Sequence, residues 1–280
     1  MLSVLFIKEN SKILFSEFHL DTARLYQGKF LRDIVNMQQN RPTKAEFEFS
    51  FAFQPIVDTR LREIISYEAL VRGPKGQPAA DVLSRVDRYH VQSFDQDCRR
   101  KAIQLASSLR MSKHLNLNLF PHALYQTELN IRTTLQAAYN HSFPFENIVF
   151  EITESEKISD NKTLVNLIRM YHEFGFQTAI DDFGSGYAGL QLLVEYRPNT
   201  IKLDRSLIAD VHDDPVRQIV VDGVIRICSH LNIQIVAEGV EKVEEYAWLR
   251  NAGIHIFQGY YFAYPAFEAL PEVDRTLYSM

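Results

Sequence analysis

The sequence predicts an α/β protein built as a (β/α)8 TIM-like barrel, and three observations support this fold class. Eight short strand-like runs follow one another between residues 48 and 263. Helix-like stretches separate most of these runs, an alternation that is typical of a mostly parallel sheet. Eight strands within about 230 residues also match the usual size of such a barrel.

The strand-like runs are short, apolar and bounded by polar segments. They occupy 48–57, 63–71, 114–120, 148–153, 177–183, 200–204, 233–240 and 254–263. The clearest helix-like stretches are 81–109, 163–174, 216–231 and 242–251. Only five residues separate the first two strands. Parallel strands need a crossover of a dozen or more residues, so these two should pair antiparallel. We therefore expect a barrel with an antiparallel first strand.

Residues 1–45 have a different pattern and are expected to form a short N-terminal extension to a barrel domain of residues 46–275. Two apolar runs, 4–7 and 13–15, flank a polar stretch, which predicts a short hairpin. Apolar side chains then recur at helical spacing at Tyr26, Phe30, Ile34 and Met37. The polar stretch 38–44 contains a proline and is typical of a linker.

Composition limits the classes of partner and compartment. The 280 residues carry 30 basic and 35 acidic side chains, a net charge of −5. This mild acidity argues against a DNA partner bound through bulk charge. The two cysteines, Cys98 and Cys228, lie too far apart in sequence to suggest a disulfide framework. We find no run of 18 apolar residues and a poor match to a signal peptide, so we expect a cytoplasmic protein without a membrane span.

Polar residues interrupt the apolar strands, mostly towards their carboxyl ends. The interruptions fall in seven strands and are Glu68, Asn118, Glu151, Asp181, Asp182, Lys202, Glu238 and Gln258. In a (β/α)8 barrel these strand ends converge on one rim, where active sites are built. At about 4 Å and an effective dielectric of about 20, two like charges repel by roughly 4 kcal/mol. Positive charge is therefore expected among these carboxylates.

The donor types indicate which cation this rim would hold. All candidate ligands are oxygen donors, and the nine histidines are scattered. This set favours Mg²⁺ or Mn²⁺ over zinc, and the number of carboxylates suggests two ions. A two-metal site suits attack of water on a phosphodiester. Lys202, the single cation of the set, could orient or deprotonate that water, or balance charge in the transition state.

Each residue also has a purely structural interpretation. Asp181 and Asp182 could cap a helix, Lys202 could form a buried salt bridge, and Asn118 could satisfy backbone groups at a strand end. These interpretations explain the residues singly, but they do not explain why seven strands place polar groups at one rim.

Seven short motifs resemble the EAL-domain family. They are EALVR (68–72), NLF (118–120), EITE (151–154), DDFGSGYAGL (181–190), KLDRSLI (202–208), EGVE (238–241) and QGYYFAYP (258–265). The match runs in the family's order from about residue 47 to about residue 273. Members hydrolyse the bacterial second messenger cyclic di-GMP to linear pGpG. The resemblance implies a barrel with an antiparallel first strand, a metal-dependent phosphodiesterase and a homodimer.

The resemblance also implies a role for each matching residue. The implied metal ligands are Glu68, Asn118, Glu151, Asp181, Asp182 and Glu238. Lys202 would act on the attacking water, and Gln258 would help to hold the water or the substrate. Glu238, also a metal ligand, would complete the catalytic set. The nucleotide site would be lined by Gln54, the Val71 backbone and Arg72. Glu154 would anchor the loop 183–189, which in this family links the active site to dimerisation.

Four points stay open from the sequence. Asn116 shares strand parity with Asn118, so alternation cannot separate them as ligands; Asn118 lies nearer the strand end. The loop carries Ser185, Ala188 and Gly189 where the family usually has DDFGTGYSSL, which bears on loop coupling but not on metal binding. The chain could also be a receptor that holds cyclic di-GMP, or a partner protein, without turnover. The N-terminal extension could bind a regulatory partner.

Overall fold

The computed structural model describes residues 48–87, 89–119, 127–153, 161–186 and 189–279. The predicted hairpin, helix and linker of the N-terminal extension lie outside these ranges, as does Glu154. The extension and its boundary near residue 45 therefore stay predictions.

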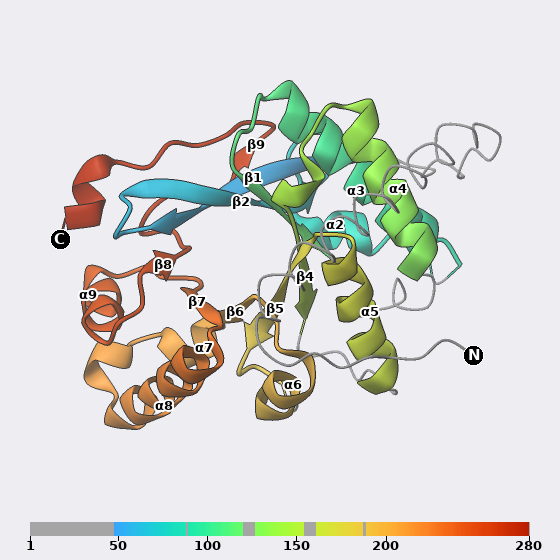
Figure 1. The fold of residues 1–280 in the computed structure, drawn as a ribbon. Helices are drawn as coiled ribbons and strands as arrows, with labels where there is room; N and C mark the ends of the chain where they lie inside the picture. The colour runs from blue at the N-terminus through green and yellow to red at the C-terminus, as the bar shows by residue number, and fades with distance from the viewer. Residues whose placement is uncertain (1–47, 88, 120–126, 154–160, 187–188, 280) are drawn as a thin grey trace, which may run out of the picture. The chain divides into compact units, whose positions relative to one another are not determined.

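Eight strands close into a barrel (Figure 1). They are β1 (Ser50–Asp58), β2 (Glu63–Arg72), β3 (His114–Asn118), β4 (Ile148–Thr153), β5 (Gln177–Phe183), β6 (Thr200–Leu203), β7 (Gln234–Ala237) and β8 (Ile256–Phe257). Strands β2 to β8 pair in sequence order and in parallel, whereas β1 is antiparallel to both β2 and β8. The predicted fold class is thus confirmed. A short β9 (Ala266–Phe267) pairs with β1 beside β8.

The β1–β2 hairpin shows why the first strand is antiparallel. Oδ1 of Asp58 accepts the backbone N–H groups of Arg60 and Leu61, at 2.8 and 3.1 Å. An aspartate that binds the backbone two and three residues ahead stabilises a tight turn. The chain therefore reverses at once, and Asp58 pairs with Glu63 at the start of β2.

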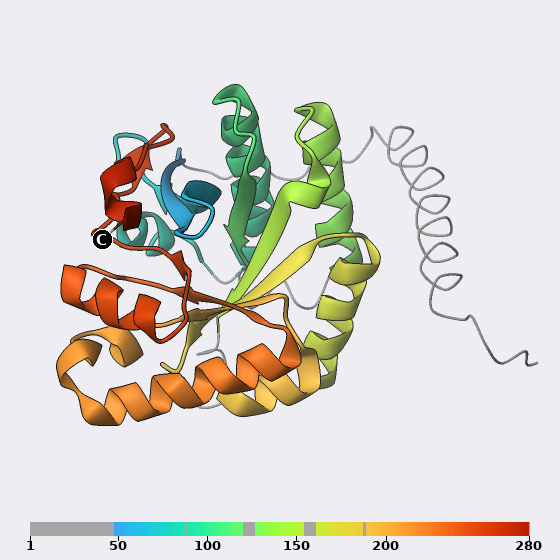
Figure 2. The same ribbon diagram turned by 60° about the vertical axis from the view of Figure 1, so that its left-hand side comes forward.

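Helices lie around the outside of the strands (Figures 1 and 2). The longer ones are α3 (Val91–Ser108), α4 (Thr127–Asn140), α5 (Asn161–Glu173), α6 (Gly189–Tyr196), α8 (Pro215–Leu231) and α9 (Val243–Asn251). Short helices α2 (Ala79–Leu83) and α7 (Arg205–Ile208) and 3₁₀ turns at Phe145–Asn147, Val211–Asp213 and Arg275–Ser279 complete the described chain.

Two predicted elements are corrected by the structure. The single helix over 81–109 is wrong, because Oδ1 of Asp87 accepts the N–H groups of Tyr89 and His90 and forms a turn between α2 and α3. The eighth strand is two residues long rather than ten. It ends where Gly259 packs on the backbone of Val240, so closely that a Cβ at Gly259 would lie 2.1 Å from the Val240 carbonyl oxygen.

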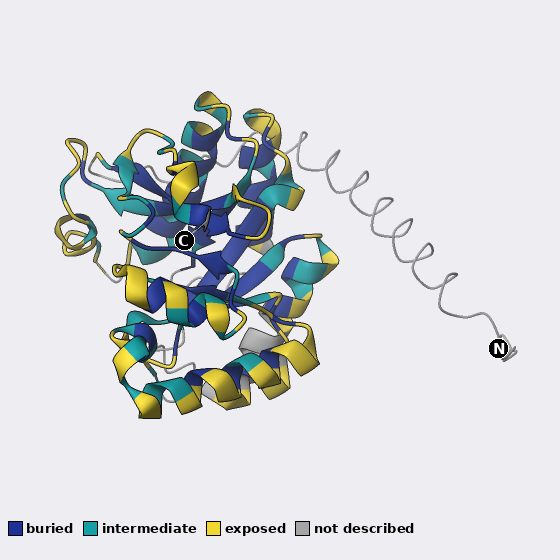
Figure 3. Ribbon diagram, turned by 90° about the vertical axis from the view of Figure 1, so that its left-hand side faces the viewer, coloured by how far each residue is buried: buried dark blue, intermediate teal, exposed yellow. Residues whose placement is uncertain are grey.

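Large apolar and aromatic side chains fill the space between strands and helices. Phe150 on β4 stacks on Tyr171 of α5 at 4.3 Å between ring centroids, and Phe257 on β8 meets Tyr246 of α9 at 5.0 Å. Figure 3 shows the resulting gradient, with buried strands inside and exposed outer helix faces. Within the described ranges, no helix is long and apolar enough to cross a bilayer.

Candidate metal centre

A fully buried lysine lies at the centre of the predicted site. Nζ of Lys202, on β6, is within ion-pairing distance of four carboxylates from four other strands or strand ends. Its partners are Asp181 at 2.9 Å, Glu68 and Glu151 at 3.1 Å each, and Glu238 at 3.3 Å. The barrel thus brings together residues that are up to 170 positions apart in the chain, from Glu68 to Glu238.

The surrounding charges decide the protonation state of Lys202. Burial alone would lower its pKa, but the carboxylates, Asp181 foremost, raise the pKa well above its ordinary value. Lys202 is therefore an ammonium group in this arrangement. It can orient or balance charge, but it could take a proton from water only after cations had neutralised its neighbours.

The carboxylates form two overlapping groups. In each group, three oxygens, one from each side chain, lie within 4.8 Å of one another. The first contains Glu68, Glu151 and Asp181, and the second contains Asp181, Asp182 and Glu238. Asp181 belongs to both. When fully ionised, five carboxylates and one ammonium sum to −5 + 1 = −4, which two divalent cations would neutralise.

A break in the regular pairing of β5 lets two consecutive aspartates share this site. Side chains on a regular strand alternate between faces, so neighbours should point apart. The pairing of β5 with β6 shifts between Ile180 and Phe183, and Asp182 has a left-handed φ of 53°. Burial, and then the adjacent Asp181 charge, raises the pKa of Asp182 to about 6.

Glu151 shows most clearly that this donor set fits a cation. Its side chain is wholly buried, and burial, reinforced by the Glu68 charge, raises the pKa of Glu151 well above its ordinary value. Its Oε1 contacts Lys202, but its Oε2 is buried without a hydrogen-bond partner among the described residues. An unpaired buried carboxylate oxygen is costly unless it binds a cation. An all-oxygen set of this kind suits Mg²⁺ or Mn²⁺.

The two candidate asparagines occupy different places. Asn118, at the end of β3, donates to Oε1 of Glu68 at 2.9 Å. Asn116 donates to Oε1 of Glu151 at 2.8 Å, and its own oxygen accepts a hydrogen bond from the hydroxyl of Ser66. Because the Asn116 oxygen is already engaged, the geometry favours Asn118 as the amide ligand.

Two glutamines connect the cluster to the strands that close the barrel. Nε2 of Gln258 donates to Oε2 of Glu68 at 2.7 Å and lies 3.2 Å from Oε1 of Gln54. Gln54, on β1, donates to the carbonyl oxygen of Ala263 at 3.2 Å. Both predicted glutamines therefore lie in the hydrogen-bonded network around Glu68.

Val71 and Arg72 lie at the carboxyl end of β2, outside this network as far as the described residues extend. The Arg72 guanidinium donates to the carbonyl oxygen of Val71 at 2.8 Å.

Two residues that sequence reasoning did not assign also bear on the site. Ser66 holds Asn116, and the charge of Asp204 helps to raise the pKa of Asp182, after burial and Asp181. Ser66 lies two positions from Glu68 on β2, so strand alternation could have found it, whereas Asp204 lies just beyond β6 as the N-cap of α7.

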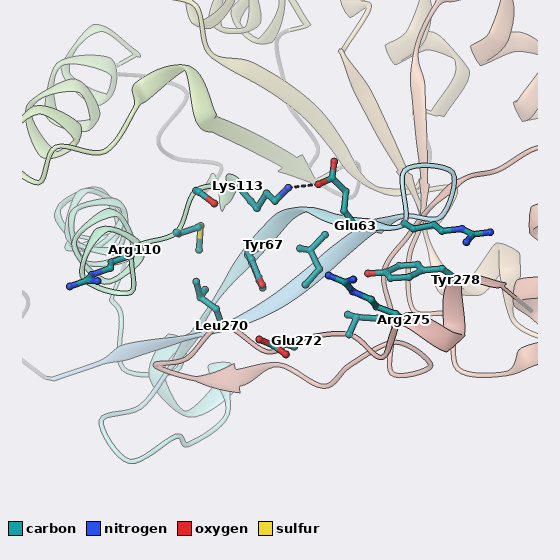
Figure 4. A pocket seen from close by; sticks show the side chains of 13 residues that line it. Glu63, Tyr67, Arg110, Lys113, Leu270, Glu272, Arg275 and Tyr278 are labelled. Atoms are coloured by element: carbon teal, nitrogen blue, oxygen red, sulfur yellow. Dashed lines mark hydrogen bonds and ion pairs between the residues drawn. The ribbon is translucent and has the colours of Figure 1, made fainter.

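A separate pocket lies on the outer side of β2 (Figure 4). Its volume is about 370 Å³, and its walls come from the start of β2, residues 110–113 and residues 270–278. Tyr67 lines it, whereas the next residue, Glu68, faces the carboxylates inside the barrel. At its edge, Nζ of Lys113 lies 2.6 Å from the Glu63 carboxylate. Alternation along β2 thus separates this pocket from the acidic cluster.

Comparison with known proteins gives consistent matches. A model of the EAL domain family matches residues 13–265. The antirepressor BluF of Escherichia coli K12 is 34% identical over 224 residues, covering 80% of this chain and 56% of BluF. The probable cyclic di-GMP phosphodiesterase PdeG of the same organism is 33% identical over 223 residues, covering 76% of this chain and 44% of PdeG. The chain thus spans about half the length of these curated relatives.

Solved structures agree in fold. A standalone EAL protein from Vibrio cholerae O395, in its cyclic di-GMP-bound form, is 49% identical with a TM-score of 0.81, covering 84% of this chain and 99% of that one. BlrP1 of Klebsiella pneumoniae, in a complex with manganese and cyclic di-GMP, is 32% identical with a TM-score of 0.77, covering 83% of this chain and 60% of BlrP1.

Proposed function

Because the chain belongs to the EAL domain family, we propose that it hydrolyses cyclic di-GMP to linear pGpG at the acidic end of its barrel. The observation that carries this proposal is the arrangement around Lys202, in which five carboxylates form two groups that share Asp181. The substrate class comes from relatives: PdeG is named a probable cyclic di-GMP phosphodiesterase, and the similar Vibrio structure holds cyclic di-GMP.

We propose two Mg²⁺ or Mn²⁺ ions as the cofactors, consistent with the manganese complex of BlrP1. Glu68, Asn118, Glu151 and Asp181 would hold one ion, and Asp181, Asp182 and Glu238 the other. When bound, such a pair lowers the pKa of a bound water and stabilises charge on phosphodiester oxygens.

The chain's own residues would then position the reactants. Nζ of Lys202 and Nε2 of Gln258 both contact Oε2 of Glu68, at 3.1 and 2.7 Å, and from there both would orient the attacking water. That water forms the new P–O bond and the bond to a ribose 3′-oxygen breaks, which leaves a 5′-phosphate and a 3′-hydroxyl. Arg72, at the rim, would contact substrate phosphate, beside Gln54 and the Val71 backbone.

We also propose a homodimer, as the family resemblance implies. Support comes from apolar side chains on the outer faces of two helices. On α8 the residues Val216, Ile219, Val220, Ile227 and Leu231 are exposed, and on α6 Leu190 and Val194 are exposed. The helices lie beside each other in Figures 1 and 2. An exposed apolar surface of this kind is typical of an interface.

The alternative is a module that holds cyclic di-GMP or a protein partner without turnover. The observation that favours it is the similarity to BluF, which is named an antirepressor. The presence here of every ligand position implied by the family favours hydrolysis. Incubation of the purified chain with cyclic di-GMP and Mn²⁺, followed by nucleotide chromatography, separates the two. Hydrolysis predicts a linear dinucleotide product, whereas a binding module would retain intact cyclic di-GMP.

A further inference from the structure

Three buried polar side chains form a hydrogen-bonded chain across β2, β3 and β4. The hydroxyl oxygen of Ser66 lies 3.2 Å from the carbonyl oxygen of His114, but its single hydrogen has a closer acceptor in Oδ1 of Asn116. Nδ2 of Asn116 in turn donates to Oε1 of Glu151 at 2.8 Å. Their exposed fractions are 6%, 5% and 0%. Ser66 shares the inner face of β2 with Glu68, which lies opposite Asn116 in the strand register. The chain therefore ends on a carboxylate of the acidic cluster.

The two oxygens of Glu151 have different surroundings. Oε1 is contacted from two sides, by Asn116 at 2.8 Å and by Lys202 at 3.1 Å. Oε2 is buried and has no hydrogen-bond partner within the described part of the chain. An unpaired buried acceptor costs about 1–3 kcal/mol, and more when it is charged. This asymmetry fixes Oε1 as the oxygen held by the protein and leaves Oε2 for a cation.

Lys202 cannot hold Glu151 by itself, because its ammonium group is shared among four carboxylates. Asn116 supplies a directional hydrogen bond to Glu151. Ser66 fixes the direction of that bond, since an amide whose oxygen accepts from Ser66 must present its N–H₂ group elsewhere. Residues that orient a ligand in this way typically change metal affinity 10- to 100-fold when they are removed.

We propose that Asn116 is a positioning residue that aims Oε2 of Glu151 at a bound cation, and that Ser66 sets the orientation of Asn116. The proposal rests on the metal site of the proposed function and assigns Asn116 a role distinct from that of Asn118. Asn118 would be a ligand through its oxygen, whereas Asn116 would act only through Glu151.

Substitution by leucine, which has a similar volume and no polar atoms, tests this distinction on one strand. In Asn116→Leu, calorimetric titration should show Mn²⁺ binding about 10- to 100-fold weaker than in the wild-type chain. The kcat for cyclic di-GMP should return to near the wild-type value at saturating Mn²⁺, with KM unchanged, because all ligands remain. In Asn118→Leu a ligand is lost, so kcat should stay low at any Mn²⁺ concentration.

Two further variants test the role of Ser66. Ser66→Ala should weaken Mn²⁺ binding in the same direction but by less, and Ser66→Thr, which keeps the hydroxyl, should restore it. Asn251→Leu, at the exposed end of α9, is the matched control and should bind Mn²⁺ as the wild-type chain does. Far-UV circular dichroism would reveal whether Asn116→Leu folds. If it does not fold, the comparison of Mn²⁺ affinity between Ser66→Ala and Ser66→Thr still tests the proposal.

The outcomes separate this inference from the proposed function. Unchanged Mn²⁺ affinity in Asn116→Leu, with a wild-type chain that binds Mn²⁺ and hydrolyses cyclic di-GMP, would overturn only the positioning role. An Asn116→Leu enzyme that stays inactive at saturating Mn²⁺, as Asn118→Leu should, would make Asn116 a ligand and would also overturn it. A wild-type chain that binds no Mn²⁺ would overturn the metal site itself.

Discussion

At the scale of single residues, Lys202 explains how so many carboxylates can share one end of the barrel. Its ammonium group contacts Glu68, Glu151, Asp181 and Glu238 within 3.3 Å. It still leaves excess negative charge, and burial raises the pKa of Glu151 and of Glu238 well above their ordinary values. We therefore expect Lys202 to stabilise the fold when no cations are bound and to orient water when they are.

Replacing Lys202 should therefore affect stability and turnover in different ways. Lys202→Met leaves buried carboxylates unpaired, so the metal-free chain should lose about 3–5 kcal/mol of unfolding free energy. Mn²⁺ should recover most of that loss, since it supplies the missing positive charge, but turnover should stay lower by orders of magnitude. Urea unfolding with and without Mn²⁺, together with a turnover assay, measures both effects.

Lys242→Met is the control, because Lys242 is exposed and pairs with Asp210 at the surface. It should leave stability and turnover unchanged. A stability loss in Lys202→Met that Mn²⁺ does not reduce would mean that Lys202 holds the fold by packing rather than by charge.

At the scale of elements, the carboxyl ends of β2 to β8 position the site, and the turn after β8 brings the backbones of Gly259 and Val240 close together. The N–H of Gln258 donates to the carbonyl oxygen of Ala237 and its own carbonyl accepts from Val240, at 2.9 and 3.0 Å. Gly259 lies directly on the Val240 backbone. This close approach fixes Gln258 beside Glu68.

Gly259→Ala should displace that turn, because the new Cβ would lie 2.1 Å from the Val240 carbonyl oxygen and backbone cannot easily give way. We expect at least a hundredfold loss of turnover, since a displacement of about 1 Å can cost that much. Gln104→Ala is the control, because Gln104 is exposed on helix α3, which belongs neither to this turn nor to the α6 and α8 faces of the proposed dimer. It should keep full turnover. Equal turnover in both variants would refute this account of the turn.

The elements also show what a sequence can predict here. Strands β2, β4 and β5 were placed within about a residue because apolar runs with clear polar ends define them. The helix break at Asp87 was missed because it depends on a side-chain turn that competes with the helix. The end of β8 was missed because the approach of Gly259 to Val240 is a tertiary contact.

The same limit applies to the site: a pattern within one strand could be predicted, whereas a contact between distant segments could not. Glu68, Glu151 and Lys202 are polar residues in apolar strands, and parallel strands carry their ends to one rim. The left-handed backbone that turns Asp182 towards Asp181 has no signature in the amino-acid pattern. The link from Ser66 through Asn116 to Glu151 joins three strands, so only coordinates could establish it.

At the scale of the whole molecule, the proposed homodimer makes a separable prediction. Ile219 and Val194 are 73% and 77% exposed on the outer faces of α8 and α6. The wild-type chain should sediment as a dimer, and Ile219→Asp or Val194→Asp should sediment as a monomer with reduced turnover. Val243→Asp, at an exposed valine of α9, should remain dimeric. A wild-type chain that sediments as a monomer and is fully active would contradict the proposal that dimerisation supports turnover.

The central claim is that the two carboxylate groups hold two cations bridged by Asp181. Anomalous diffraction at the manganese edge, from crystals grown with Mn²⁺ and cyclic di-GMP, tests it most directly. The account predicts two peaks, each about 2.0–2.4 Å from an Asp181 oxygen, as expected for a hard divalent ion and an oxygen ligand. One peak should also lie near Oε2 of Glu151. The absence of manganese from this cluster, or a single ion that does not contact Asp181, would contradict the claim.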